Sequence, residues 1–183
     1  SVQHDLIPRS IMGNNEICQA NAKTGKTTAY VISTLHQLIP INGEVSLLVL
    51  CPTREIAASI GKKYEIFSKY LPNIKIKVFS EDSANKKKRK ENHGQNKNVP
   101  HIVVGTPVLI HSQVKSGAIK FDRITHLVID NCDRIIGDFK QRSHVNGIVK
   151  STPQQKQIMM FSSVHHENIR LSCDRFTRNG SFD

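Results

Sequence analysis

Short runs rich in Val, Ile and Leu recur along the chain, and longer amphipathic segments separate most of them. Several of these runs are apolar at every position, which is typical of strands that are buried on both faces of a parallel sheet. The predicted strands are Glu16–Ala20, Val45–Cys51, Ile74–Phe79, His101–Gly105, Thr125–Asp130 and Gln157–Ser162.

The segments between the strands have the apolar spacing of helices that pack one face against a core. Strands that alternate with helices predict a doubly wound α/β fold, a parallel sheet flanked by helices. In such a sheet the functional loops lie at the carboxyl ends of the strands. The predicted helices are Val2–Met12, Lys26–Leu38, Arg54–Tyr70, Val108–Lys115 and His166–Thr177.

Net charge and composition narrow the class of partner. The 183 residues carry a formal net charge of +11 and include no Trp, and aromatic residues make up 5%. Strong basicity favours a polyanionic partner such as nucleic acid, although a merely solvated basic surface would look the same. The scarcity of aromatic residues argues against base stacking and favours contacts to backbone phosphates. We expect no membrane partner, because no apolar run approaches the roughly 18 residues that a spanning helix needs.

The segment Ser80–Asn98 has hardly any large apolar residues and carries five consecutive basic residues. We expect an exposed loop or a loose helix here. The basic run could contact nucleic acid or direct the protein to the nucleus, and a simple solvated charge run remains the alternative. The run consists of Lys86, Lys87, Lys88, Arg89 and Lys90.

A candidate phosphate-binding loop follows the first predicted strand. The sequence Gly25-Lys26-Thr27 lies between that strand and an apolar helix, which is the context that a P-loop requires. Backbone N–H groups and the helix N-terminus would hold phosphate, Lys26 would reach the β- and γ-phosphates, and Thr27 would bind magnesium. The residues expected to bind nucleotide in this loop are Ala20, Lys23, Thr24, Gly25, Lys26 and Thr27.

An apolar strand ending in a carboxylate supplies the second part of a nucleotide site. Leu127–Asp130 has this Walker B pattern, so Asp130 is expected to bind the magnesium ion of a nucleotide, directly or through water. The chain continues Asn131-Cys132-Asp133. Asn131 is neutral, so it can orient a water molecule but cannot accept its proton. A positioned general base is worth about 10²–10⁴ in rate.

With these motifs in place, the chain resembles the first RecA-like domain of a DEAD-box RNA helicase. Further motifs follow in the family's order: Gln3 before Ile7-Pro8, the P-T-R-E-I-A segment at 52–57, V-G-T-P at 104–107 and S-S-V at 162–164. The D-x-C-D segment and other fragments, such as Pro100–Pro107 and Met159–Ser162, are similar to the DECD subfamily that acts in splicing and nuclear mRNA export.

The resemblance covers essentially the whole chain and implies a RecA-like P-loop NTPase domain over residues 1–183. We expect this domain to begin within the Q motif and to lack the second helicase domain. The resemblance further implies that Gln3 reads adenine and that Ser162 couples nucleotide to RNA. It also implies ATP or ADP with Mg²⁺ as cofactor. The RNA-binding residues that it implies are Thr53, Arg54, Gly105 and Thr106, to which we add the basic run 86–90.

Five departures from the family pattern fall on its functional motifs. Lys23 replaces a glycine of the phosphate loop, and if that position needs a positive φ it costs roughly 1–2 kcal/mol. Asn131 replaces the glutamate that activates water, so we expect no catalytic residue there. Val108-Leu109 replaces Gly-Arg, Glu81-Asp82 replaces a glycine pair, and Val164 replaces threonine.

A chain that keeps the apolar residues of its core strands but has substitutions in its functional motifs is typical of a pseudo-enzyme. The first hypothesis is therefore a catalytically impaired module that binds RNA backbone or protein partners of mRNA splicing and export in the nucleus. We expect its binding of ATP or ADP with Mg²⁺ to be weak or lost. The alternative is a functional ATP-dependent RNA helicase domain that tolerates its substitutions. Whether the chain is an enzyme is left open between these two.

Overall fold

The computed structural model describes residues 1–79 and 99–182. The predicted loop Ser80–Asn98, with Glu81-Asp82 and the basic run 86–90, lies outside the described residues. Within the described ranges, no helix combines the length and the apolar character that crossing a membrane would demand.

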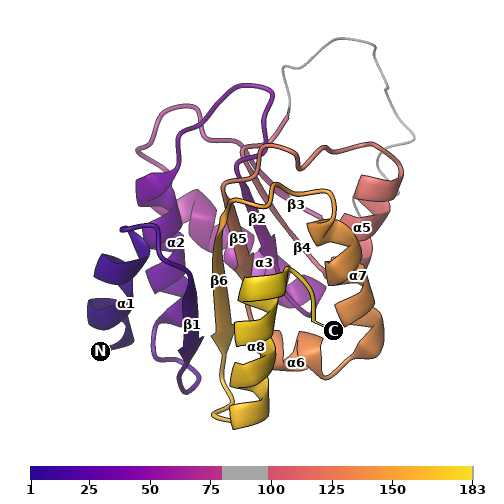
Figure 1. Ribbon diagram of the computed structural model, residues 1–183. Helices are drawn as coiled ribbons and strands as arrows, with labels where there is room; N and C mark the ends of the chain where they lie inside the picture. The colour runs from indigo at the N-terminus through magenta and orange to yellow at the C-terminus, as the bar shows by residue number, and fades with distance from the viewer. Residues whose placement is uncertain (80–98, 183) are drawn as a thin grey trace.

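The centre of the molecule is a parallel sheet in the order β1-β6-β5-β2-β4-β3 (Figure 1). Every neighbouring pair of strands is parallel. The four residues of β2 are buried without exception, as are those of β4 and β5, which explains why these runs contain no polar residue except His126. The strands are β1 (Glu16–Gln19), β2 (Leu47–Leu50), β3 (Ile76–Val78), β4 (Ile102–Gly105), β5 (His126–Ile129) and β6 (Gln157–Ser162).

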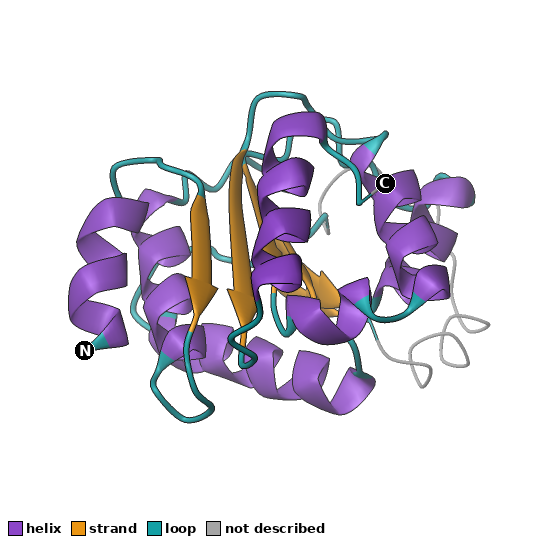
Figure 2. Cartoon of the chain, turned by 60° about the horizontal axis from the view of Figure 1, so that its bottom comes forward, coloured by secondary structure: helices purple, strands orange, loops and turns teal. Residues whose placement is uncertain are grey.

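Helices cover both faces of this sheet (Figure 2). One buried cluster joins the sheet to α1, α2 and α3 through side chains such as Leu6, Tyr30 and Ile60. The other joins it to α5, α6, α7 and α8. The helices are α1 (Val2–Ser10), α2 (Lys26–Gln37), α3 (Arg54–Phe67), α5 (Pro107–Lys115), α6 (Cys132–Ile136), α7 (Phe139–Val149) and α8 (Glu167–Asn179).

The α/β fold with a parallel sheet flanked by helices is confirmed, and all six predicted strands are present, β6 with the predicted bounds and the other five shorter than predicted. The sequence interpretation missed α6 and α7. Helix α6 spans only Cys132–Ile136, and α7 begins almost at once, after its N-cap residue Asp138. Helix α6 is too short to show a helical period, and α7, although it has 11 residues, has no apolar residue between Phe139 and Val145.

The aligned strand ends bring distant motifs together. Leu50 lies beside Gly105 in one neighbouring strand and beside Ile129 in the other, and Ile129 in turn lies beside Met160. Because all strands run in one direction, the loops that follow them emerge at one edge of the sheet. The motifs at residues 20–27, 52–57, 106–109, 130–133 and 162–164 therefore share this edge.

Candidate functional site

The phosphate loop closes around the side chain of Lys26, the first residue of α2. Its ammonium group donates to the backbone carbonyl of Ala20 at 2.5 Å and to that of Asn21 at 2.7 Å. The Thr24 hydroxyl also donates to the Asn21 carbonyl, at 2.8 Å. The N–H groups at the N-terminus of α2 favour an anion, and Lys26 places a positive charge at the same end of the helix, where its ammonium group is bonded to the loop carbonyls.

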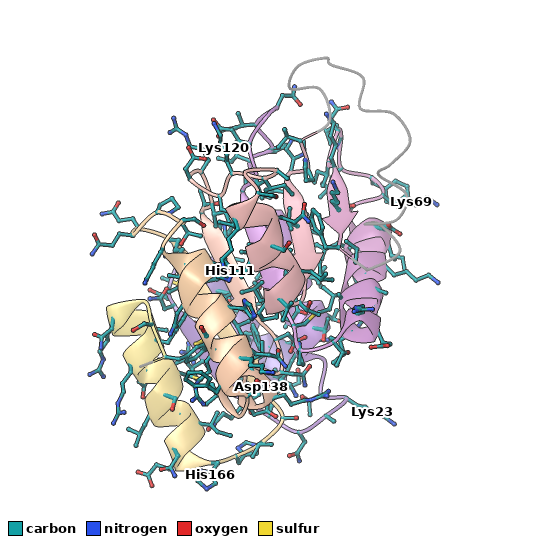
Figure 3. All side chains as sticks on the ribbon, turned by 90° about the vertical axis from the view of Figure 1, so that its right-hand side faces the viewer. Lys23, Lys69, His111, Lys120, Asp138 and His166 are labelled. Carbon is teal, nitrogen blue, oxygen red and sulfur yellow. The ribbon has the colours of Figure 1, made fainter. Side chains whose placement is uncertain are left out.

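Two residues of this loop, Lys23 and Gly25, have a left-handed backbone conformation. Gly25, the N-cap of α2, has φ 89°, and Lys23 has φ 64°. Glycine adopts this region at no steric cost, whereas a residue with a Cβ is strained there by about 1–2 kcal/mol. The position of Lys23 therefore does need a positive φ, so the strain energy expected for a residue other than glycine applies to it. Lys23 is exposed at the end of the molecule that also carries Asp138 (Figure 3).

Gln3 of α1 lies against the phosphate loop. A Cβ built on Gly25 would come within 2.4 Å of the Gln3 side-chain nitrogen. The absence of a side chain at Gly25 is thus what allows the Gln3 amide to reach the loop. An amide can both donate and accept hydrogen bonds, which suits the edge of a purine base.

Asp130 follows β5 directly, and both of its carboxylate oxygens are engaged. Oδ2 accepts from the Tyr30 hydroxyl of α2 at 2.8 Å, and Oδ1 accepts from the backbone N–H of Asn131 at 2.8 Å. Tyr30 is completely buried and Asp130 is only 5% exposed. The carboxylate is consequently tied to α2, the helix that carries Lys26.

Burial sets the protonation behaviour of this pair. Desolvation raises the pKa of Asp130 above its ordinary value, while the hydrogen bonds from Tyr30 and Asn131 and the charge of Lys26 lower it. Desolvation, followed by the charge of Asp130, raises the pKa of Tyr30 well above its ordinary value. Tyr30 is therefore a hydrogen-bond donor at every physiological pH. Its partner is a buried carboxylate, and burying that charge reduces the stability of the folded domain.

Asn131 occupies the turn between β5 and α6 in a left-handed conformation, with φ 48° and ψ 46°. Asparagine tolerates this region better than most residues with a side chain. Its amide has no ionisable proton, so this position carries neither an acid nor a base.

A hydrogen bond links the D-x-C-D segment to the end of β6. The Ser162 hydroxyl donates to Asp133 Oδ1 at 2.9 Å, and the backbone N–H of Val164 donates to the same hydroxyl at 3.0 Å. Val164 itself is 42% exposed and offers no hydroxyl. The structure thus brings Ser162 into contact with the acidic segment but leaves an apolar side chain two residues later.

A cavity of about 440 Å³ lies on the same edge, between the starts of α3, α5 and α7. Thr53 caps α3 by accepting from the Ile56 N–H at 3.3 Å, whereas the N-cap Thr106 of α5 makes no such side-chain bond. We call this cavity the groove. It is lined by Pro52, Thr53, Arg54, Glu55, Thr106, Val108, Leu109, Asp138, Lys140 and Gln141.

The groove mixes both charge signs with apolar side chains. Val108 is 49% exposed, and the Gln141 amide oxygen is buried without a partner among the described residues. Asp138 contributes its carboxylate, although it also caps α7 through the N–H groups of Lys140 and Gln141. Cap residues and a charged rim can hold a phosphate, but the exposed apolar side chain at Val108 contributes nothing to phosphate binding.

These residues fit a nucleotide in part. The loop amides, Lys26 and Gln3 provide groups for phosphate and base, and Thr27 and Asp130 are the expected oxygen ligands of its magnesium ion. A bound Mg²⁺–ATP would supply the γ-phosphoryl group and the metal that neutralises its charge. Lys23 adds bulk to the loop, and Tyr30 competes for one oxygen of Asp130.

Sequence reasoning missed three residues of this edge: Tyr30, Asp138 and Gln141. Tyr30 stands one turn after Thr27, and a polar tip within a buried helix face was the available signal. Asp138 and Gln141 were missed together with α7, because the local sequence pattern did not predict that helix.

Three comparisons place the chain among known proteins. The profile of a family described as DEAD/DEAH box helicase matches residues 1–171. The chain is 41% identical over 178 residues to human "ATP-dependent RNA helicase DDX39A", covering 97% of this chain and 41% of that protein. It is 43% identical over 179 residues to "ATP-dependent RNA helicase SUB2" of Lodderomyces elongisporus, with 97% and 41% covered. The chain thus spans less than half the length of these relatives.

Solved structures share the fold. A DEAD box protein from the hyperthermophile Methanococcus jannaschii matches with a TM-score of 0.81 at 25% identity, covering 97% of this chain and 47% of that one. Saccharomyces cerevisiae Dbp5 L327V bound to RNA and ADP BeF3 matches with a TM-score of 0.83 at 20% identity, covering 97% and 44%. Both confirm the RecA-like arrangement that the sequence predicted.

Proposed function

The chain belongs to the DEAD/DEAH box helicase family, and from that premise we propose that it is a catalytically impaired ATP-binding domain that holds RNA or a protein partner. Its relatives are named as ATP-dependent RNA helicases. Binding to RNA backbone without sequence preference would follow from the net charge of +11 and from the cap residues of the groove.

One observation carries the proposal: the position between the two carboxylates that follow β5 is an amide, Asn131, and not a base. Asp130 has both oxygens engaged by Tyr30 and Asn131, Asp133 accepts from Ser162, and the residue between them is an amide. A water molecule placed at this edge could be oriented by Asn131 but not deprotonated by it. The lost base alone would slow hydrolysis by about 10²–10⁴.

Nucleotide binding is expected to be weak rather than absent. Lys26 still carries its charge at the start of α2, although its ammonium group must exchange its bonds to the Ala20 and Asn21 carbonyls for bonds to phosphate, and Gln3 remains beside the loop. Lys23 in its left-handed conformation and the Tyr30–Asp130 hydrogen bond both work against a tight Mg²⁺–nucleotide complex. Positioning carries much of phosphoryl-transfer catalysis, so a loosened loop reduces turnover as well.

The resemblance to the DECD subfamily further supports a role in nuclear mRNA splicing or export. Protein partners of those processes, and a nuclear location, are part of this proposal. The basic run 86–90 would assist RNA contact or nuclear import.

A working helicase domain is the second candidate. The observation in its favour is the bond between Ser162 and Asp133, which joins the acidic segment to β6 as an ATP-to-RNA coupling element would require. RNA-stimulated phosphate release by the full-length protein separates the two candidates. Turnover at a rate ordinary for the family would establish the second, and binding of nucleotide without turnover would support the first.

A further inference from the structure

Two histidines that take no part in the nucleotide site face each other between α5 and α7. His111 Nδ1 lies 2.9 Å from His144 Nδ1, and the two rings meet edge to face with their centroids 5.2 Å apart. Figure 3 shows His111 between the end of the molecule that carries Asp138 and the opposite end that carries Lys120. One ring must donate and the other must accept, so the pair holds one proton between two nitrogens.

Packing fixes the pair in place. Gly147 stands one turn after His144 on α7, and a Cβ there would come within 2.4 Å of the His111 ring. The glycine therefore makes the space that the His111 ring occupies. Helices α5 and α7 pack side by side, so both imidazoles are carried by regular, mutually supported elements rather than by loops.

The pair opens onto solvent. Both histidines are half-buried, and a cavity of about 400 Å³ adjoins them, lined by Val108, Ser112, Lys115 and Ser116 in addition to the two rings. Burial lowers the pKa of His111, and the charges of Lys115 and His144 lower it further. At neutral pH His111 is consequently neutral and able to offer a lone pair.

We propose that His111 and His144 form a binding site for a divalent transition-metal ion, with Zn²⁺ or Cu²⁺ as the chemical class. Two imidazole nitrogens bound to one tetrahedral zinc at 2.0–2.1 Å lie roughly 3.3 Å apart. The observed separation of 2.9 Å needs only a few tenths of an ångström of opening. The metal takes the place of the shared proton, which moves to Nε2 of the same ring so that both imidazoles stay neutral, and water would complete the coordination.

Among residues 1–79 and 99–182, no group of three or more His, Cys, Asp or Glu side chains could hold a metal ion. The proposed site therefore has two protein ligands, and the ion exchanges readily. Lys115, on the wall of the same cavity, opposes the positive charge of the metal. These features predict moderate affinity and fast release rather than a permanent structural ion.

The site connects the two helices whose first turns line the groove. Val108 belongs to α5, and Lys140 and Gln141 belong to α7. A metal bound between His111 and His144 would hold these two helix starts at one separation. This inference concerns a separate site and stands whether or not the domain hydrolyses ATP.

The test is calorimetric titration of the untagged 183-residue chain with Zn²⁺, Cu²⁺ and Mg²⁺ in a metal-free, non-chelating buffer. We expect one equivalent of Zn²⁺ to bind, Cu²⁺ to bind more tightly, and Mg²⁺ to leave the Zn²⁺ isotherm unchanged, which is the order that imidazole ligands impose. The midpoint of thermal unfolding should rise with the logarithm of Zn²⁺ concentration. Absence of Zn²⁺ binding would overturn the proposal.

Variants locate the site. His111→Gln and His144→Gln should each weaken Zn²⁺ binding at least tenfold, while the exposed pair His165→Gln/His166→Gln serves as the matched control and should change nothing. Lys115→Gln should strengthen binding, because it removes a charge without removing a ligand; this variant also keeps the proposal testable should either histidine variant fold poorly. Binding that survives both single histidine changes, or weakens in Lys115→Gln, would contradict the assignment.

Discussion

The Tyr30→Phe substitution separates stability from nucleotide binding in this domain. It removes only the hydroxyl that donates to Asp130 Oδ2 at 2.8 Å, and both residues are buried. A hydrogen bond to a charged group contributes about 1.5–3 kcal/mol, so unfolding at pH 7 should become easier by this amount. For a domain of this size that corresponds to roughly 3–12 °C in Tm.

The loss should depend on pH. Burial raises the pKa of Asp130 in the folded protein, and the Tyr30 hydrogen bond lowers it, so the substitution raises that pKa further. A carboxyl group with a raised folded pKa contributes stability below its unfolded pKa and loses it as pH rises through the folded value. The difference between Tyr30→Phe and the unmodified chain should therefore be larger at pH 7 than at pH 4.

Tyr64→Phe is the matched control. The Tyr64 hydroxyl lies 2.8 Å from the Thr34 hydroxyl, and both groups are buried. Loss of this bond between two neutral groups should cost about 0.5–1.5 kcal/mol with no such dependence on pH. Urea denaturation of both variants at pH 4 and pH 7 measures these differences. Equal, pH-independent losses in the two variants would refute the role given to Asp130.

The same substitution should improve nucleotide binding. Freeing Oδ2 gives Asp130 one oxygen without a hydrogen bond for the magnesium ion that it is expected to bind, so the affinity for Mg²⁺–ADP should rise while stability falls. Calorimetric titration with Mg²⁺–ADP checks this. An affinity that falls in parallel with stability would mean that Tyr30 supports the site instead of competing for it.

Three further predictions concern the phosphate loop, the missing base and the RNA-binding surface. Lys23→Gly should stabilise the loop conformation by about 1–2 kcal/mol, partly offset by the entropy of glycine in the unfolded chain, and should tighten ADP binding, as seen by calorimetry. Asn131→Glu alone should not restore RNA-stimulated phosphate release in a protein joined to an intact second RecA-like domain. The triple variant that also carries Lys23→Gly and Val164→Thr should recover part of this activity. Full recovery by Asn131→Glu alone would show that the other two substitutions are harmless. RNA affinity should fall steeply as salt rises and should depend little on RNA sequence. Neutralising the basic run 86–90 should weaken RNA binding more than Arg54→Ala does. The reverse order in a fluorescence polarisation assay would place RNA on the surface that carries Arg54.

The strands could be predicted because burial on both faces dictates their composition. Runs such as Leu47–Leu50 and Ile102–Gly105 are completely buried, and no polar residue could stand there without a partner. The edge of the sheet that carries the motifs followed from the parallel order of the strands. Helices α6 and α7 could not be predicted in this way, because α6 has only five residues and the first half of α7 is polar after Phe139.

Contacts between residues distant in sequence were beyond local patterns. Tyr30 and Asp130 are separated by 100 positions, and His111 and His144 by 33. Neither pair has a spacing that marks it, and only the packing of α2 on β5, or of α5 on α7, brings the partners together. By contrast, backbone strain at Lys23 could be predicted from the sequence, because a glycine position of a phosphate loop is where a positive φ is expected.

RNA-stimulated phosphate release at saturating Mg²⁺–ATP tests the central claim most directly. The full-length protein that carries this domain, saturated with Mg²⁺–ATP and with single-stranded RNA, should bind nucleotide detectably yet release phosphate no faster with RNA than without it. The same protein should bind RNA throughout, which excludes misfolding as the cause. Phosphate release that RNA accelerates to the rate of an ordinary member of the family would contradict the account.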